Sequence, residues 1–283
     1  MTIQCIGYKT KAFEARNLAF FFLSSLGVPF LVGWFTYTGL LHKPQDFRDP
    51  ILIPWLLLNL PVLLGPSTAA FVVAGLTEGK PGVKELWMRF WSRNVSLKWL
   101  LVAVLILPIL RLIAAVLTQV LSNTSYPFLV EGGVLDVLIV PIGMGLFSGI
   151  HEEFGWRGYA LPRFQAKWNA LISCIILGVI TALWHLPGFI TPGEPLFGRN
   201  FWEWLPWHML IQIVGFSWIF NNTKGNVLAV ILFHATTSLS LFVVDFTYYW
   251  VLLVAAILIV AVFGAKDLVI RLNYRNEALQ KSR

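Results

Sequence analysis

Residues 134–159 read VLDVLIVPIGMGLFSGIHEEFGWRGY. The segment is long and apolar enough to cross a bilayer as a helix, which takes about 20 residues. Towards its end, however, Glu152 and Glu153 stand side by side and Arg157 follows them. Each such group costs about 2.5 to 3.5 kcal/mol at the centre of a spanning helix, so ionisable residues there usually serve a function. The segment therefore predicts both a membrane helix and a functional site within it.

The rest of the chain has the composition of a polytopic membrane protein. Of the 283 residues, 57% are hydrophobic and 12% are charged, which is typical of a chain with several spans. We expect an all-α membrane bundle of eight helices that forms a single membrane-embedded domain over residues 1–283. The expected helices cover residues 18–41, 51–76, 97–121, 134–159, 170–190, 205–220, 227–244 and 248–265.

The basic residues predict how the chain is oriented in the membrane. If the N-terminus is cytoplasmic, sixteen of the 21 Lys and Arg residues fall in cytoplasmic segments, three in outer loops and two within spans. Positive charge collects on the cytoplasmic side of membrane proteins. Both termini are therefore expected in the cytoplasm, and the membrane is the plasma membrane if the cell is prokaryotic. The first span is expected to be retained, because it is longer than the apolar region of a secretory signal.

Other features of the sequence argue against a nucleic-acid partner and against a cysteine-based site. The segment from Lys84 to Arg93 interleaves basic residues with Trp and Phe. This pattern favours a helix in the inner membrane interface over a nucleic-acid patch, so no nucleic-acid partner is expected. The two cysteines, Cys5 and Cys174, make no disulfide framework and have no metal-site spacing.

Helix geometry gives the two adjacent acids different roles. Neighbouring residues of a helix point about 100° apart, whereas residues four apart share a face. Glu153 and Arg157 therefore form an acid-before-base pair, which neutralises both charges in a low-dielectric setting. Glu152 is left to face the interior of the bundle. It is either a functional carboxylate or a second buried acid, held protonated or bonded to a neighbouring helix.

Two histidines in later spans are placed to reach Glu152. If helices 134–159 and 170–190 form a hairpin, Glu152 lies about 21 Å and His185 about 28 Å from the turn. His234 lies about 12 Å into the span that begins at residue 227, on the same side of the membrane. Ser238 follows His234 by one helical turn and shares its face. These helices can therefore bring the four polar side chains together in the inner half of the membrane.

Several known catalytic motifs are absent from the sequence. The zinc motif H-E-x-x-H begins at His151 but fails at Gly155, where the second His is required. The serine motif G-x-S-G fails because Leu146 takes the place of its first glycine. No aspartate lies in the G-x-G-D context of intramembrane aspartyl proteases. What remains is a glutamate with two histidines.

That remaining set resembles the CPBP family, the CAAX-protease and bacteriocin-processing intramembrane peptidases, which are also called Abi proteins. The first motif of the family, E-E-x-x-x-R, matches Glu152, Glu153 and Arg157 in full. The similarity extends over about residues 135–241, with the motifs in the right order and on successive helices. The expected eight-helix layout also agrees with the core of this family.

The other two motifs match with one departure each. The second, F-x-x-x-H, matches at His185, with Thr181 in place of the aromatic residue. The third, H-x-x-x-N or a polar substitute, matches at His234, with Ser238 in the last position. Together, the three motifs in a polytopic membrane protein are much more specific than the first alone.

The resemblance implies an intramembrane endopeptidase that hydrolyses a peptide bond near the cytoplasmic face, by CAAX-type or leader-peptide-type proteolysis. Glu152 would act as general base on the attacking water, supported by the neighbouring Glu–Arg pair. His185 and His234 would bind the oxyanion or, together with Glu152, a metal ion, for which zinc is the candidate. Ser238 would fill the role of the family's Asn. The implied partners are a lipid bilayer and a peptide or protein substrate, either lipidated or membrane-associated.

Two other functions fit the same scaffold. A non-catalytic member would act as an immunity or partner-binding protein, and cleavage that is lost on changing Glu152 distinguishes the enzyme from it. A transporter would use the same polar cavity. Transport calls for internal inverted repeats and broken helices in matching halves, and the sequence does not have them.

Overall fold

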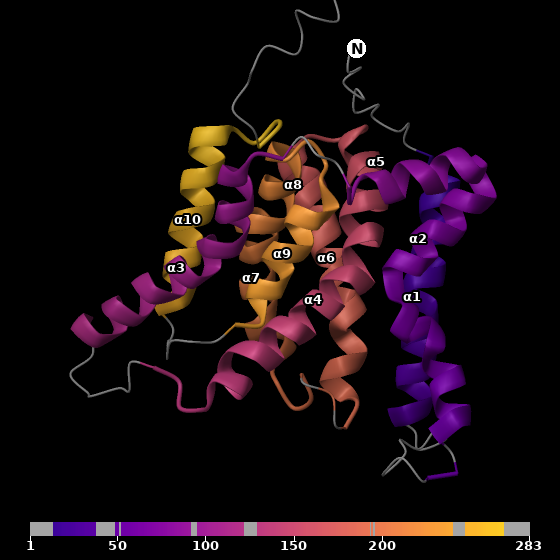
Figure 1. The fold of residues 1–283 in the computed structure, drawn as a ribbon, viewed down its shortest axis with the longest axis horizontal. Coiled ribbons are helices and arrows are strands. Elements are labelled where there is room, and N and C mark those ends of the chain that lie inside the picture. Colours follow the sequence, from indigo (N-terminus) through magenta and orange to yellow (C-terminus); the bar gives the residue numbers. More distant parts are fainter. Residues whose placement is uncertain are drawn as a thin grey trace, which may run out of the picture.

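The computed structural model is a bundle of helices (Figure 1). It describes residues 14–37, 49–50, 52–91, 95–121, 129–192, 194, 196–239 and 247–268. Within these ranges the regular elements are all helical, and no β-strand is present. The all-α fold expected from the sequence is therefore confirmed.

Within the described ranges, consecutive helical segments join into eight helices, several of which include wide π-helical turns, labelled η. The first three are α1 (Ala15–Tyr37), α2 (Leu52–Met88) and α3 (Leu97–Leu121). The fourth joins η1 (Leu135–Ile139), α4 (Val140–Glu153), η2 (Phe154–Ala160) and α5 (Leu161–Gln165) without a break, and α6 (Ala170–Ile190) follows it. The sixth joins α7 (Phe201–Ile211), η3 (Gln212–Ser217) and α8 (Trp218–Asn222), and the last two are α9 (Val227–Thr237) and α10 (Thr247–Phe263).

Length and apolar character support a membrane location. Among the described residues, three helices are long and apolar enough to cross a membrane: α3, the continuous helix Leu135–Gln165, and α6. Helices α9 and α10 are apolar but shorter. The predicted bounds of α3 and α6 agree with the structure at both ends.

Helix α2 differs from the prediction, because it continues well beyond residue 76. Its backbone bends at Gly65 and Gly79, where φ is 54° and 66°, a conformation that glycine adopts without the steric cost of a Cβ atom. Figure 1 shows the last part of α2 lying across the end of the bundle where α5 is found. This part holds the start of the predicted interfacial segment and exposes Trp87, and Trp91 just beyond the helix end is also exposed. Its position in the membrane interface stays a prediction.

Helix α9 ends earlier than predicted, at Thr237, and residues 240–246 lie outside the described ranges. The hydroxyls of Thr236 and Thr237 donate to the carbonyls of Phe233 and His234, each at 2.7 Å. Such bonds from Thr to the preceding turn compete with helix continuation. The start of the helix is sharp, because the Asn226 side chain accepts from the backbone N–H of Ala229 at 2.7 Å and so caps it.

Close packing of α4 against α9 brings the candidate residues together. A Cβ atom on Gly145 would lie 2.7 Å from the Cα atom of Ala235, and one on Gly149 would lie 3.1 Å from the side chain of Ile231. Small residues at such positions let two helix backbones approach closely. The glycines of α4 therefore place His234 of α9 beside the two acids at the end of α4.

Candidate active site

Glu152 and Glu153 are the last residues of α4 and precede the wide turn η2 directly. Their side chains are 7% and 0% exposed. Wide π-helical turns within α-helices occur often at functional sites. The two adjacent acids are therefore buried at a distorted point of a membrane helix.

Glu153 pairs with Arg157, as the sequence predicted. The Nη1 atom of Arg157 donates to both carboxylate oxygens of Glu153, at 3.1 and 3.0 Å. The guanidinium of Arg157 also lies over the ring of Phe216, with its Cζ atom 3.9 Å from the ring centroid. Both charged side chains are almost fully buried, so each depends on the other for a partner.

Glu153 has a second partner, His234, that the sequence did not predict for it. Its Oε1 atom lies 2.7 Å from Nδ1 of His234. Because an ionised carboxylate only accepts hydrogen bonds, we assign the shared proton to Nδ1. That bond fixes the orientation of the imidazole and directs Nε2 towards Glu152. Glu153 therefore contacts a candidate catalytic residue in addition to its structural pair with Arg157.

Glu152 lies on the other side of His234. Its Oε1 atom is 4.0 Å from Nε2 of His234, which is too long for a direct hydrogen bond. Within the described part of the chain, no group donates a hydrogen bond to the Glu152 carboxylate. One water molecule that bonds to both atoms at about 2.8 Å would fit this separation. Glu153 is therefore held by partners and Glu152 is not, and the division of roles between them stays a prediction.

His185 lies on α6 in an aromatic environment. Its ring packs edge-to-face against Trp184, Trp204 and His208, with centroid distances of 4.9, 5.3 and 5.7 Å. His185 is therefore packed against α7, next to His208.

The predicted metal-binding set is formed only in part. Among the described residues, the one group of ligand atoms that could hold an ion comes from Glu152, Glu153 and His234, with all atoms within 4.8 Å of one another. Carboxylate oxygen and imidazole nitrogen are suitable zinc ligands. Both oxygens of Glu153 already accept hydrogen bonds from Arg157, which leaves Glu152 and Nε2 of His234 as the available pair. His185 does not belong to this group, although the sequence predicted it as the third ligand.

Ser238 lies outside the buried cluster. It directly follows the last residue of α9, and its side chain is exposed. Its backbone is still helical, with φ −79° and ψ −15°, but its side chain is not buried with Glu152 and Glu153. The hydroxyl that donates to the carbonyl of His234 is that of Thr237, at 2.7 Å, so the alternative interpretation of Ser238 is not the one observed among the described residues.

Two buried polar residues, His208 and Gln212, were missed by the sequence analysis, and Thr181 was noted there only as a departure from the second motif. Gln212 accepts a hydrogen bond from Nη2 of Arg157 and contacts the other two through its amide nitrogen. A signal was available, because His208 and Gln212 are polar residues four apart in an otherwise apolar segment, and such residues face one side of a helix.

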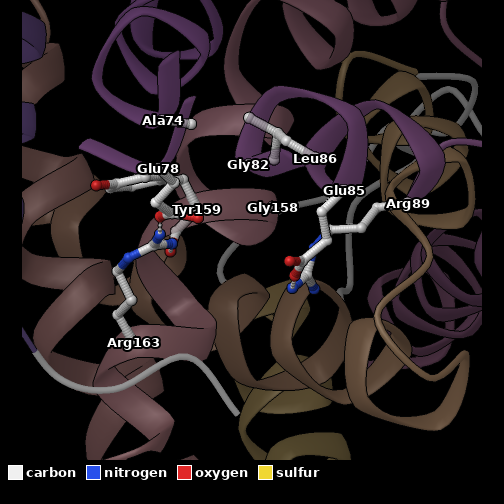
Figure 2. Close-up of a pocket in the computed structure, with 9 residues that line it drawn as sticks. All are labelled: Ala74, Glu78, Gly82, Glu85, Leu86, Arg89, Gly158, Tyr159 and Arg163. Atoms are coloured by element: carbon white, nitrogen blue, oxygen red, sulfur yellow. Dashed lines mark hydrogen bonds and ion pairs between the residues drawn. The ribbon is translucent and has the colours of Figure 1, made fainter. Parts of the chain in front are cut away.

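A separate small pocket lies between α2 and the end of the helix 135–165 (Figure 2). Figure 2 shows two charged pairs on its walls, Arg163 with Glu78 and Arg89 with Glu85. The other residues that line it are Ala74, Gly82, Leu86, Gly158 and Tyr159. None of the candidate catalytic residues lines this pocket. We therefore place the candidate active site at the buried Glu–Arg–His cluster.

The fold and the site together define a class: a helical membrane bundle with two buried glutamates, an arginine and a histidine at the junction of α4, η2 and α9. Residues 133–240 match the family described as type II CAAX prenyl endopeptidase Rce1-like. The chain is also 24% identical over 232 residues to CAAX prenyl protease 2 of Methanococcus maripaludis. The aligned region covers 79% of this chain and 83% of that protein. These findings confirm the resemblance to the CPBP family that the three motifs predicted.

Proposed function

We propose that the protein is an intramembrane endopeptidase that hydrolyses a peptide bond near the cytoplasmic face of the membrane. The observation that carries this proposal is the Glu152 carboxylate, which is buried, accepts no hydrogen bond within the described residues, and lies 4.0 Å from an oriented histidine. It lies within the segment that matches the Rce1-like family. A general base must be within reach of a water molecule, directly or through a partner that positions it.

In the proposed mechanism, Glu152 takes a proton from a water molecule while the water oxygen attacks the carbonyl carbon of the scissile peptide bond. The negative charge that develops on the carbonyl oxygen needs hydrogen-bond donors, and a single such donor is typically worth about 3 to 4 kcal/mol. His234 supplies one from Nε2 in its imidazolium form, which the carboxylate of Glu153 stabilises. His185 supplies a second. The C–N bond then breaks, and the proton on Glu152 passes to the leaving amine.

Two of the same side chains, Glu152 and His234, could also bind a metal ion. A divalent ion bound by Glu152 and His234 would polarise the peptide carbonyl and activate bound water. Treatment of the purified protein with a chelator, followed by re-addition of Zn²⁺, tests this directly. Activity that survives the chelator favours the general-base role of Glu152 alone, and activity that returns only with Zn²⁺ assigns Glu152 and His234 to a metal.

The proposed substrate is a protein or peptide with a prenylated CAAX C-terminus. This follows from the name of the matched family and that of the archaeal relative, both of which specify a CAAX prenyl substrate. A lipid group would also hold the substrate at the membrane in which the proposed site lies. Peptides with bacteriocin-type leaders serve as the comparison class.

The experiment uses the purified full-length protein in detergent or liposomes, with a fluorescent peptide that carries a farnesylated C-terminal motif. Glu152→Gln keeps the size of the side chain but removes the base, so it should abolish cleavage without loss of folded protein. The matched control is Glu131→Gln, because Glu131 is exposed and precedes the same helix. If Glu152→Gln cleaves as fast as the wild type, the proposed mechanism is wrong. A wild type that binds the peptide without cleaving it indicates the non-catalytic alternative.

A further inference from the structure

A chain of buried polar contacts extends from Arg157 on the side away from Glu153. Nη2 of Arg157 donates to Oε1 of Gln212. The amide nitrogen of Gln212 lies 3.0 Å from Nε2 of His208 and 3.3 Å from Oγ1 of Thr181. Thr181 and His208 are also in contact through the same atoms, at 2.9 Å. All of these side chains are buried.

The hydrogen-bond chemistry of this chain allows one orientation of the Gln212 amide. A guanidinium group only donates, so the amide oxygen must face Arg157 and the NH₂ group must face the other two residues. An NH₂ group also only donates. We therefore assign Nε2 of His208 as its acceptor, which makes His208 a neutral imidazole with its proton on Nδ1. The reverse orientation of the amide would place two donors against each other at Arg157.

The backbone is built to admit Gln212 at this position. Gln212 is the first residue of the wide turn η3, and Arg157 lies in the wide turn η2. On the facing helix α6, Gly178 has no side chain, and a Cβ atom there would lie 3.1 Å from Cγ of Gln212 and 3.0 Å from Sδ of Met209. The stem of Gln212 therefore fits against the bare backbone of α6, and its amide reaches the two buried polar residues beyond.

We propose that Gln212, with its two polar neighbours, is a positioning residue of the active site. It holds Arg157, which holds Glu153, which in turn orients His234. Arg157 depends on this contact, because its Nε atom already has no hydrogen-bond partner in the part of the chain that the structure describes. Without Gln212, a second buried donor would lose its acceptor, and the guanidinium would shift and take Glu153 with it. The catalytic consequence rests on the function proposed above.

The test compares two substitutions of similar size at the same position. Gln212→Met fills the space but accepts no strong hydrogen bond, so we expect kcat to fall by about ten- to a hundredfold while KM changes by less than about twofold, as is typical when a supporting partner of an active-site residue is lost. Gln212→Glu keeps an acceptor for Arg157 whether or not it is protonated. It should be at least about fivefold faster than Gln212→Met, as expected if the acceptor is what matters.

The matched control removes an amide of the same helix that is far from the site along the chain. Asn222 donates to the backbone carbonyls of Trp218 and Leu268, both at 2.8 Å. Asn222→Leu should lower the thermal stability and leave kcat unchanged. If Gln212→Met behaves like Asn222→Leu, or is as fast as Gln212→Glu, then Gln212 only fills space and the proposal is overturned.

A second readout does not depend on catalysis. The chain contains five histidines, so ¹⁵N-histidine labelling yields a small set of ring signals, and His234→Gln identifies the one from His234. The proposal predicts that Gln212→Met shifts the His234 ring signal although the two residues do not touch, and that Asn222→Leu does not. An unchanged His234 signal in Gln212→Met overturns the proposal.

The outcomes separate this inference from the proposed function. If the wild type cleaves no peptide, the proposed function fails, and the histidine signals still decide whether Gln212 orients His234. If Gln212→Met does not fold, Thr181→Val replaces it, because it removes an acceptor of the Gln212 amide while keeping the side-chain shape. A smaller loss of kcat in Thr181→Val, with the His234 signal shifted in the same direction, supports the inference, and no change in either overturns it.

Discussion

Replacing Glu153 by alanine should destabilise the protein more than any change at Glu152. Glu153 is fully buried and accepts three hydrogen bonds, two from Arg157 and one from His234. Removing one partner of a buried ion pair costs about 3 to 5 kcal/mol, because the other charge is left uncompensated. Gln212 still accepts one bond from Arg157, so we expect the lower part of that range, about 3 kcal/mol.

Glu152→Ala should cost much less. Its carboxylate accepts no hydrogen bond within the described residues, and its contact with His234 is 4.0 Å long. Loss of the few apolar atoms of its side chain is expected to cost about 1 kcal/mol, as for a buried methylene group. The two alanine variants should therefore differ by about 2 kcal/mol in the free energy of unfolding, although they are neighbours in the sequence and both are buried.

The assay is equilibrium unfolding in mixed micelles, followed by tryptophan fluorescence and compared at equal detergent concentration. Glu153→Gln serves as the intermediate case, because it keeps an acceptor for Arg157 but removes the charge. We expect the order of stability wild type, Glu152→Ala, Glu153→Gln, Glu153→Ala, from highest to lowest. Equal destabilisation by the two alanine substitutions would refute the different roles assigned to the two acids.

Three further predictions concern other parts of the site and the topology. Gly145→Ala should lower stability by about 1 to 3 kcal/mol through overpacking and reduce activity, because the added Cβ atom meets the backbone of Ala235. Gly143→Ala, where a Cβ atom meets nothing within 4 Å, should be neutral or stabilising by up to about 1 kcal/mol; equal effects would contradict the close α4–α9 contact. Ser238→Ala should change kcat by less than about threefold, because its side chain is exposed, and a loss of tenfold or more, the size expected for an oxyanion donor, would return Ser238 to the site. An impermeant thiol reagent applied to intact cells should miss Cys5 and label a cysteine introduced at Gln45, as the distribution of basic residues predicts; the opposite pattern would reverse the orientation.

The sequence alone determined the features that depend on near neighbours in the chain. Runs of apolar residues predicted eight helices, and two of them, α3 and α6, were predicted with the bounds that the structure has. The Glu153–Arg157 pair was predicted because residues four apart on a helix meet regardless of what surrounds them. The three motifs led to a family resemblance that the comparisons with known proteins confirm. Each of these inferences needs only local periodicity or a short pattern.

Tertiary structure decided how the helices face one another, and this fixed the partners of the site residues. The contact between His234 and Glu153 depends on the close approach of α4 and α9 at Gly145 and Gly149, which no spacing within one helix reveals. The wide turns η2 and η3 change the direction in which the side chains after them point around the helix axis. A helical face predicted from regular α-helical spacing is therefore inaccurate beyond each of these turns. The packing of His185 against α7 and the contact of Gln212 with Arg157 depend on how neighbouring helices lie against one another. The exposure of Ser238 depends on where α9 ends. They are properties of the packed bundle, because periodicity in the sequence shows which residues of one helix share a face but not which neighbouring helix that face contacts.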